Sequence, residues 1–207
     1  MNMDELVNLN RRSMMQQALL LIGATAVPVD MALAAAAPRK RFLAPAQFQL
    51  LTALADTIVP VTDTPGALAA GVPAKLDGML SNWASAATRI KVSDALGRLN
   101  GAALASKKKG FAAMTPAERK AVLTDHDKAS LKAVPPPPGA PKLNFFTPAT
   151  YVVDPGYLTL KGLIINLYYG SEIGSTKELI YEHNPGKYQP SIKATEATRP
   201  WASVGPF

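Results

Sequence analysis

Apolar residues that recur every three or four positions, in segments bounded by prolines, most strongly constrain the fold of this chain. This spacing places apolar side chains on one face of a helix, and a proline ends a helix because it lacks an N–H donor and its ring clashes with the preceding turn. The sequence shows no alternation of apolar and polar residues of the kind that indicates β-strands, so we predict an all-α fold. The first helix is expected between Pro45 and Pro60, with Phe48, Leu51, Leu54, Ala55 and Ile58 on its apolar face.

Two further helices are expected before a run of lysines. Pro73 suits the first turn of a helix, where its missing N–H has no intrahelical partner to lose. The next helix is expected over about 92–104, with Leu96 and Leu99 in the core, and its end is expected at lysines 107–109. The apolar stripe of the helix that starts near Pro73 is predicted to consist of Val72, Leu76, Met79, Leu80 and Trp83.

The clearest helix start lies at Thr115 and Glu118. The threonine hydroxyl can accept a hydrogen bond from the backbone three positions on while the glutamate reaches back, which is a capping box. The helix is expected to run to about Leu131. Four prolines at 135–138 then force an extended polyproline segment. We interpret this segment as a spacer, with a docking strand for a proline-binding partner as the alternative.

The last part of the chain combines one strongly apolar helix with a long tail. We expect a turn at 154–156 and then a helix over 157–169, whose apolar residues cover more than one face, so burial on most sides is predicted. From about residue 171, short helical pieces alternate with Pro and Gly turns. The tyrosines and Trp201 of this tail gain order only by packing on another surface. We therefore expect an irregular helical domain with a long, loop-rich C-terminal tail that packs on a partner subunit.

Residues 1–37 have the three successive regions of a secretory signal peptide. A polar region with paired arginines comes first, a weakly apolar run at 18–27 second, and a small-residue run at 34–37 last. The apolar run is too short to cross a hydrocarbon core, which needs about 20 helical residues. The residues that match the twin-arginine consensus are Arg11 and Arg12, followed by Met14 and Met15.

We therefore predict a twin-arginine signal peptide over 1–37 and a single helical domain over 38–207, with the periplasm as its location. The alternative is an ordinary amphipathic first helix with an incidental arginine pair. That alternative does not account for the order of the three regions or for the alanine-rich end.

The composition excludes several function classes. The sequence contains no cysteine, which excludes disulfides, thiolate metal sites, cysteine-linked haem and thiol nucleophiles. A net charge of +7 could indicate a nucleic-acid partner. The basic residues, however, form short groups without the interleaved aromatic side chains that stack on bases. We therefore predict no nucleic-acid partner.

Neither of the two histidines lies in a recognisable catalytic or metal-binding pattern. Adjacent side chains on a helix point about 100° apart and cannot chelate one ion, so the Asp-His-Asp sequence at 125–127 is interpreted as a solvated helix face. His183 is interpreted as a turn or interface residue. No serine-nucleophile or phosphate-loop motif occurs, and we predict no catalytic, cofactor-binding or metal-binding residue. Caps, turns and exposed faces are the expected positions of the carboxylates Asp56, Asp63, Glu172, Glu178 and Glu182.

Two turns carry a family resemblance that covers nearly all of the predicted domain. The first is the Thr-Pro-Gly-Ala turn at 64–67, which follows the helical segment 51–60. The second is the tyrosine–glycine turn at 168–174, with Tyr181 and the segment 185–188 beyond it. Together these segments resemble the gluconate 2-dehydrogenase subunit 3 family, the small subunit of membrane-associated gluconate 2-dehydrogenase complexes.

This resemblance implies a partner rather than a catalyst. The expected partner is a large FAD-dependent subunit of the glucose–methanol–choline type. It would oxidise a sugar or sugar acid, as in gluconate 2-dehydrogenase or a sugar 3-dehydrogenase. It would pass the electrons onward, often to a c-type cytochrome. This chain would bind no cofactor, would escort the folded large subunit through the twin-arginine export machinery and would stabilise it. Any membrane association would come through the partners. The residues predicted at the partner interface are Pro60, Pro65, Gly66, Tyr168, Tyr169, Tyr181, Tyr188 and Trp201.

Two other functions stay open from the sequence alone. One is a free-standing periplasmic enzyme that depends on carboxylates, for which Asp56 or Glu172 would be essential. The other is a module that binds an anionic polymer, whose affinity would fall steeply with salt.

Overall fold

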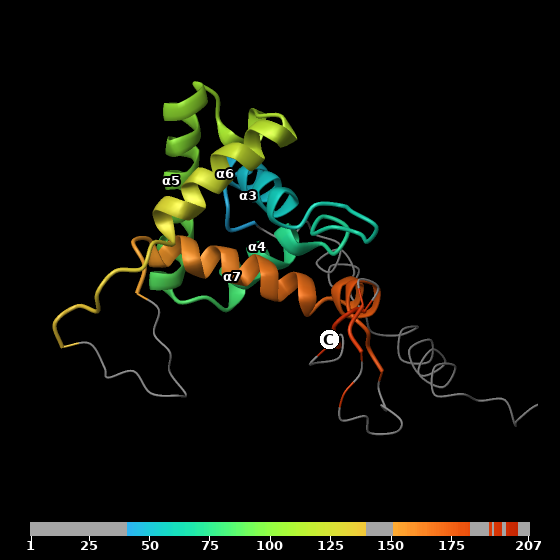
Figure 1. Cartoon of the computed structure of the whole chain (residues 1–207). Helices are drawn as coiled ribbons and strands as arrows, with labels where there is room; N and C mark the ends of the chain where they lie inside the picture. The colour runs from blue at the N-terminus through green and yellow to red at the C-terminus, as the bar shows by residue number, and fades with distance from the viewer. Residues whose placement is uncertain (1–40, 140–150, 183–190, 192, 196–197, 203–207) are drawn as a thin grey trace, which may run out of the picture. The chain divides into compact units, whose positions relative to one another are not determined.

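Helix caps and prolines mark the ends of the helices in this chain. The structure is a computed structural model, and it describes residues 41–139, 151–182, 191, 193–195 and 198–202 (Figure 1). These residues form helices and no strand beyond isolated β-bridges, which confirms the predicted all-α class. None of their helices is both long and apolar enough to cross a membrane. In chain order the elements are α3 (Pro45–Ile58), α4 (Val72–Asn82), α5 (Ala86–Lys107), the 3-10 helix η2 (Phe111–Ala113), α6 (Pro116–Ser130), α7 (Pro155–Tyr169) and the π-helix η3 (Gly174–Glu178).

Three helix starts lie where the sequence predicts them. α3 begins at its proline, and α4 begins directly after Gly71, whose φ of 69° lies in the left-handed region that favours glycine. At α6 the Thr115 N–H donates to Glu118 Oε2 at 2.9 Å, and the Glu118 N–H donates to Thr115 Oγ1 at 3.3 Å. The predicted capping box is therefore confirmed.

Two helices begin earlier than predicted. α5 begins at Ala86 rather than near residue 92, because Ser85 Oγ accepts a hydrogen bond from the Thr88 N–H at 3.2 Å. α7 begins at Pro155, so the expected turn at this position is wrong: Asp154 caps the helix and accepts from the Tyr157 N–H at 2.9 Å. A capping side chain satisfies an N–H that has no partner within its helix. The spacing of apolar residues alone does not reveal which polar residue caps a helix.

The core forms around one side of α7, which contacts α3, α4, α5 and α6 (Figure 1). No described helix covers the opposite side of α7, where Leu158 and Tyr169 are exposed. The prediction that this helix is buried on most sides is therefore wrong, because the neighbouring helices cover only one stripe of it. The fully buried residues of that stripe are Tyr157, Leu160, Ile164 and Tyr168.

The predicted apolar stripe of α4 is correct in its first part and wrong at its end. Val72, Leu76 and Leu80 are buried, whereas Met79 is exposed and Trp83 is 86% exposed. α4 ends at Asn82, and Trp83 has non-helical backbone angles, φ −122° and ψ −31°, so its side chain no longer follows the stripe. Trp83 is the most exposed large apolar side chain of the described residues.

The described parts of the C-terminal tail return to the end of η3. The Ile180 N–H donates to Pro200 O at 3.0 Å, and the Ala202 N–H donates to Ile180 O at 2.8 Å, which forms a parallel bridge between Ile180 and Trp201. These tail residues thus pair with their own chain, and packing of the tail on a partner stays a prediction. The predicted boundary between signal peptide and domain lies outside the described residues.

Candidate partner interface

The two turns that carry the family resemblance meet in space. Tyr168 Oη donates a hydrogen bond to Pro65 O at 2.7 Å, and the Thr64 hydroxyl donates to the carboxylate of Glu178. Tyr168 is only 1% exposed, and burial raises the pKa of its hydroxyl, which therefore stays a donor. We call this contact, between residues 59–67 and 168–178, the junction.

Two glycines allow the backbone to fold closely on itself within each of the two segments of the junction. A Cβ on Gly66 would lie 2.7 Å from Val59 O, and the neighbouring Ala67 N–H donates to that oxygen at 2.9 Å. A Cβ on Gly174 would overlap the carbonyl oxygen of Tyr168. Neither glycine has a positive φ, so close backbone approach, rather than backbone conformation, requires glycine at both positions.

The residues predicted at the partner interface divide between the interior and the surface of this junction. Gly66 and Tyr168 are buried within the chain, whereas Pro65 and Tyr181 are half-buried. Contact of these residues with a partner stays a prediction. The exposed members of this predicted set are Pro60, Tyr169 and Trp201. Tyr188 lies outside the described residues. The predicted export-signal residues also lie outside them: Arg11, Arg12, Met14 and Met15.

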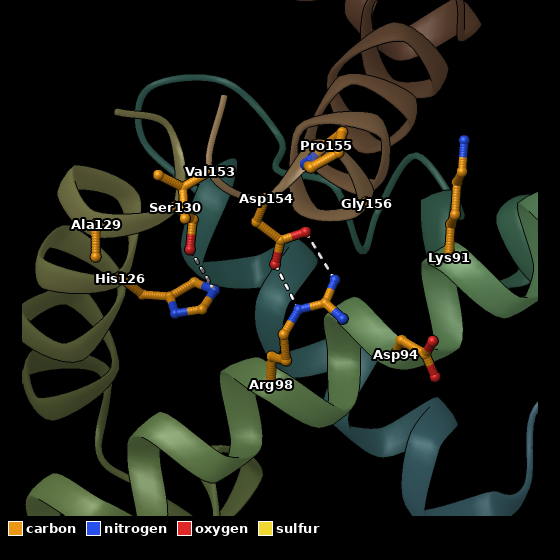
Figure 2. A pocket seen from close by; sticks show the side chains of 10 residues that line it. All are labelled: Lys91, Asp94, Arg98, His126, Ala129, Ser130, Val153, Asp154, Pro155 and Gly156. Atoms are coloured by element: carbon orange, nitrogen blue, oxygen red, sulfur yellow. Dashed lines mark hydrogen bonds and ion pairs between the residues drawn. The ribbon is translucent and has the colours of Figure 1, made fainter. Parts of the chain in front are cut away.

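A second candidate site is an open pocket of about 480 Å³ between α5, α6 and the start of α7 (Figure 2). At its centre Arg98 donates two hydrogen bonds to Asp154, 2.6 Å from Nε to Oδ2 and 2.7 Å from Nη2 to Oδ1. Burial alone would raise the pKa of Asp154, but the bonds from Arg98 and from the Tyr157 N–H, together with the Arg98 charge, lower it. The residues that line this pocket are Lys91, Asp94, Arg98, His126, Ala129, Ser130, Val153, Asp154, Pro155 and Gly156.

His126 lies on the α6 side of this pocket (Figure 2). Its Nε2 is 3.2 Å from Ser130 Oγ, and its ring packs edge-on against Tyr157 with the ring centroids 4.6 Å apart. Burial lowers the pKa of His126, and the Arg98 charge acts in the same direction, although Asp154 and Asp127 oppose it. The lowered pKa favours the neutral form of the imidazole.

Asp127 joins α6 to α7 on the neighbouring surface. Its Oδ1 accepts from Tyr157 Oη and its Oδ2 accepts from Lys161 Nζ, both at 2.5 Å. The interpretation of 125–127 as a solvated helix face is therefore wrong for His126 and Asp127, although Asp125 is exposed. The helix–helix contact with α7, which is distant in sequence, covers these two side chains.

Four polar side chains of the pocket form two hydrogen-bonded pairs, Arg98 with Asp154 and His126 with Ser130. Ser130 is buried, and no hydrogen bond among the described residues joins a carboxylate to the second ring nitrogen of His126, as an activated serine nucleophile would need. The described residues also contain no group of three or more possible ligands that could hold a metal ion. The other predicted carboxylates form ion pairs or face solvent. Asp56 Oδ2 lies 3.4 Å from Arg119 Nη1, and Asp63 Oδ2 lies 3.7 Å from Arg199 Nη2. Glu172 and Glu182 are exposed.

Sequence reasoning missed the residues that hold this network together, chiefly Arg98, Asp154, Tyr157 and Lys161. One local signal was present: an aspartate directly before a proline is typical of an N-cap followed by Pro at N1. The pairing of Arg98 with Asp154 has no local signal, since the two residues lie on different elements.

Comparison with known proteins agrees with the resemblance of the two turns. No curated protein and no solved structure gives a significant match to the chain. The family model described as gluconate 2-dehydrogenase subunit 3 matches residues 45–186, which is more than half of the chain and contains both turns of the junction. This chain therefore belongs to the gluconate 2-dehydrogenase subunit 3 family.

Proposed function

We propose that this chain is the non-catalytic small subunit of a periplasmic FAD-dependent sugar or sugar-acid dehydrogenase. The observation that carries the proposal is family membership, because the family is a subunit of a dehydrogenase complex. The large partner is of the glucose–methanol–choline type, holds the FAD, oxidises the substrate and passes electrons onward, for example to a c-type cytochrome. The small subunit stabilises it.

The bonding of the polar side chains supports a non-catalytic role. Arg98 donates two hydrogen bonds to Asp154, Asp127 accepts from two donors, and Ser130 is buried. A catalytic acid or base has to face its substrate within hydrogen-bond reach. Figure 2 instead shows Arg98 of α5 bonded to Asp154, the N-cap of α7, and His126 paired with Ser130 on α6.

The glycines of the described helices support the expectation that this chain holds no flavin. Dinucleotide-binding loops place closely spaced glycines between a strand and a helix, so that backbone N–H groups approach the pyrophosphate. Here Gly78, Gly97, Gly101 and Gly162 lie inside α4, α5 and α7, where the backbone N–H groups are used by the helix itself. The purified chain alone is expected to be colourless, and bound flavin in it would contradict the proposal.

The export part of the proposal is that the twin-arginine signal of this chain carries the folded complex to the periplasm. The test is co-expression with the FAD-dependent large subunit, comparing wild type with Arg11→Lys plus Arg12→Lys. Lysine keeps the charge but lacks the planar guanidinium, so the change probes recognition rather than electrostatics. We expect both chains to remain in the cytosol.

A matched control is Arg39→Lys plus Arg41→Lys, which makes the same chemical change outside the signal pair. Export of both chains is expected to continue in this control. If the large subunit reaches the periplasm with the Arg11 and Arg12 variant, the escort function is wrong. If the two chains never co-purify, the subunit function is wrong as well.

A further inference from the structure

The last described segment of the tail, residues 198–202, contacts both segments of the junction. Arg199 Nη1 donates to Lys177 O in η3 at 2.5 Å. Arg199 Nη2 lies 3.7 Å from Asp63 Oδ2, which belongs to the first junction segment. One side chain from the tail therefore links the two junction segments from outside. We call residues 198–202 the strap.

Two backbone hydrogen bonds hold the strap beside Ile180. The Ile180 N–H donates to Pro200 O at 3.0 Å, and the Ala202 N–H donates to Ile180 O at 2.8 Å. The strap therefore occupies both polar backbone groups of Ile180. Because each of these bonds crosses from the strap to Ile180, the amide hydrogens of Ile180 and Ala202 report directly whether the strap is in place.

The strap is held by groups that water can reach. Residues 198–201 are exposed, and Ala202 is half-buried. In the ion pair, the side chains of Arg199 and Asp63 are 46% and 81% exposed, and such pairs contribute little because water and salt screen them. Solvent-exposed hydrogen bonds and little buried apolar surface are typical of segments that open locally.

The inner bonds of the junction have the opposite character. Tyr168 is 1% exposed, and its hydroxyl donates to Pro65 O at 2.7 Å. The N–H of the fully buried Ala67 donates to Val59 O at 2.9 Å and closes the first junction segment. These bonds do not involve the strap, so they remain when the strap detaches.

We propose that the strap is a conformational latch, which opens and closes over the junction while the helical domain stays folded. When the latch is closed, Arg199 fixes the turn around Asp63 to η3. When it is open, this turn is released and both backbone groups of Ile180 become free. The strap therefore decides whether the junction presents a closed surface or a free backbone edge. The inference concerns this chain alone and does not depend on the proposed function.

Amide hydrogen exchange of the isolated full chain, followed residue by residue by NMR and compared with intrinsic rates, tests the latch. The amides of Ile180 and Ala202 should exchange at least about tenfold faster than the amide of Ile164 in α7, because local opening is enough to expose them. Low urea concentrations should accelerate exchange of Ile164 but not of the two strap amides, since local opening exposes little surface.

Arg199→Ala removes the bond to Lys177 O together with the ion pair. Exchange at Ile180 and Ala202 should therefore rise about fivefold. The Ala67 amide bonds within the first junction segment, and its exchange should rise about twofold, because the turn around Asp63 is no longer held.

Lys193→Ala is the matched control, since it removes an exposed cation of the same tail outside the strap. It should change none of these exchange rates. Both variants should keep the wild-type Tm within about 2 °C, as expected for exposed side chains, which excludes misfolding as the cause of faster exchange.

Asp63→Ala and salt separate the ion pair from the bond to Lys177 O. Asp63→Ala should raise exchange at Ile180 and Ala202 about twofold, because an exposed ion pair contributes modestly. Sodium chloride at about 1 M should have the same effect on wild type and no further effect on Asp63→Ala, since salt screens the same pair.

The outcomes are distinct. Fast exchange of the strap amides in wild type, with a further rise in Arg199→Ala but not in Lys193→Ala, supports the latch. If Ile180 and Ala202 share the exchange rate and urea dependence of Ile164, the strap unfolds only with the whole domain and the inference is wrong. If Arg199→Ala accelerates the strap amides and leaves Ala67 unchanged, the strap opens without holding the junction, which also overturns the inference.

Discussion

Arg98 on α5 holds Asp154, the N-cap of α7, through two parallel hydrogen bonds of 2.6 and 2.7 Å. The same carboxylate accepts from the Tyr157 N–H at 2.9 Å. One side chain therefore starts a helix and fixes that helix to its neighbour. Gly156 makes this arrangement possible, because a Cβ there would lie 2.9 Å from Lys91 O and 3.0 Å from Arg98 Nη2.

Asp154→Ala should lower the free energy of unfolding by about 2–4 kcal/mol, because it removes both the cap and the acceptor for Arg98. Asp154→Asn should cost less, since the amide oxygen can still cap the helix. The ion pair itself contributes modestly, as the Arg98 side chain is 49% exposed and screened by water. Urea unfolding measures both variants against Asp125→Ala, a control that removes an exposed aspartate of α6. A change below about 0.5 kcal/mol for Asp154→Ala would show that this link is dispensable.

Gly174→Ala should destabilise the chain by about 2 kcal/mol or more, because its methyl group would overlap the carbonyl oxygen of Tyr168 and force the turn between these two residues to open. Gly162→Ala should have the opposite sign and stabilise by about 0.5–1 kcal/mol, since it lies in a helix with free space around it. Thermal unfolding compares the two variants directly. Equal effects of the two substitutions would contradict the close approach described for Gly174.

Tyr157→Phe should cost about 1 kcal/mol, because the Asp127 carboxylate loses a buried donor while keeping Lys161. Burial and the bond to Asp127 raise the pKa of Tyr157, so the hydroxyl remains a donor throughout the neutral range. Tyr169→Phe is the control, since Tyr169 is exposed, and it should leave the urea midpoint unchanged. A Tyr157→Phe chain as stable as wild type would show that this bond makes no net contribution.

Stability should fall as the pH is lowered through about 6.5, the ordinary pKa of histidine. Burial lowers the pKa of His126 in the folded chain, so the unfolded state takes up its proton first and gains from it. The loss cannot exceed about 1.4 kcal/mol per pH unit, the slope for one proton. The lowered pKa of Asp154 acts only below its usual 3.8 and does not contribute in this range.

Urea unfolding at about pH 7.5 and about pH 5.5 measures this effect, with His126→Gln as the comparison. The glutamine variant lacks a titrating group at this position and should lose less stability between the two conditions. An identical pH dependence in both chains would show that His126 is not the group responsible.

Local sequence signals determined the helical character of the chain and several of its helix ends. The capping box of Thr115 and Glu118, the prolines at helix starts and the apolar spacing of α3 depend on residues within one turn of each other. The two turns at 64–67 and 168–174 also identified the family without any structural information. Hydrogen bonds and side-chain contacts one turn apart are properties of the local chain, so sequence reasoning can find them.

Only the tertiary structure decided which helix faces are covered. Trp83 belongs to an apolar pattern and is exposed, whereas His126 looks like a surface residue and packs against Tyr157. The junction and the link from Arg98 to Asp154 join segments that are far apart in the chain. Periodicity specifies that a helix has an apolar side, but burial depends on whether another element lies against that side. The packing of the whole domain therefore decides which helix faces are buried.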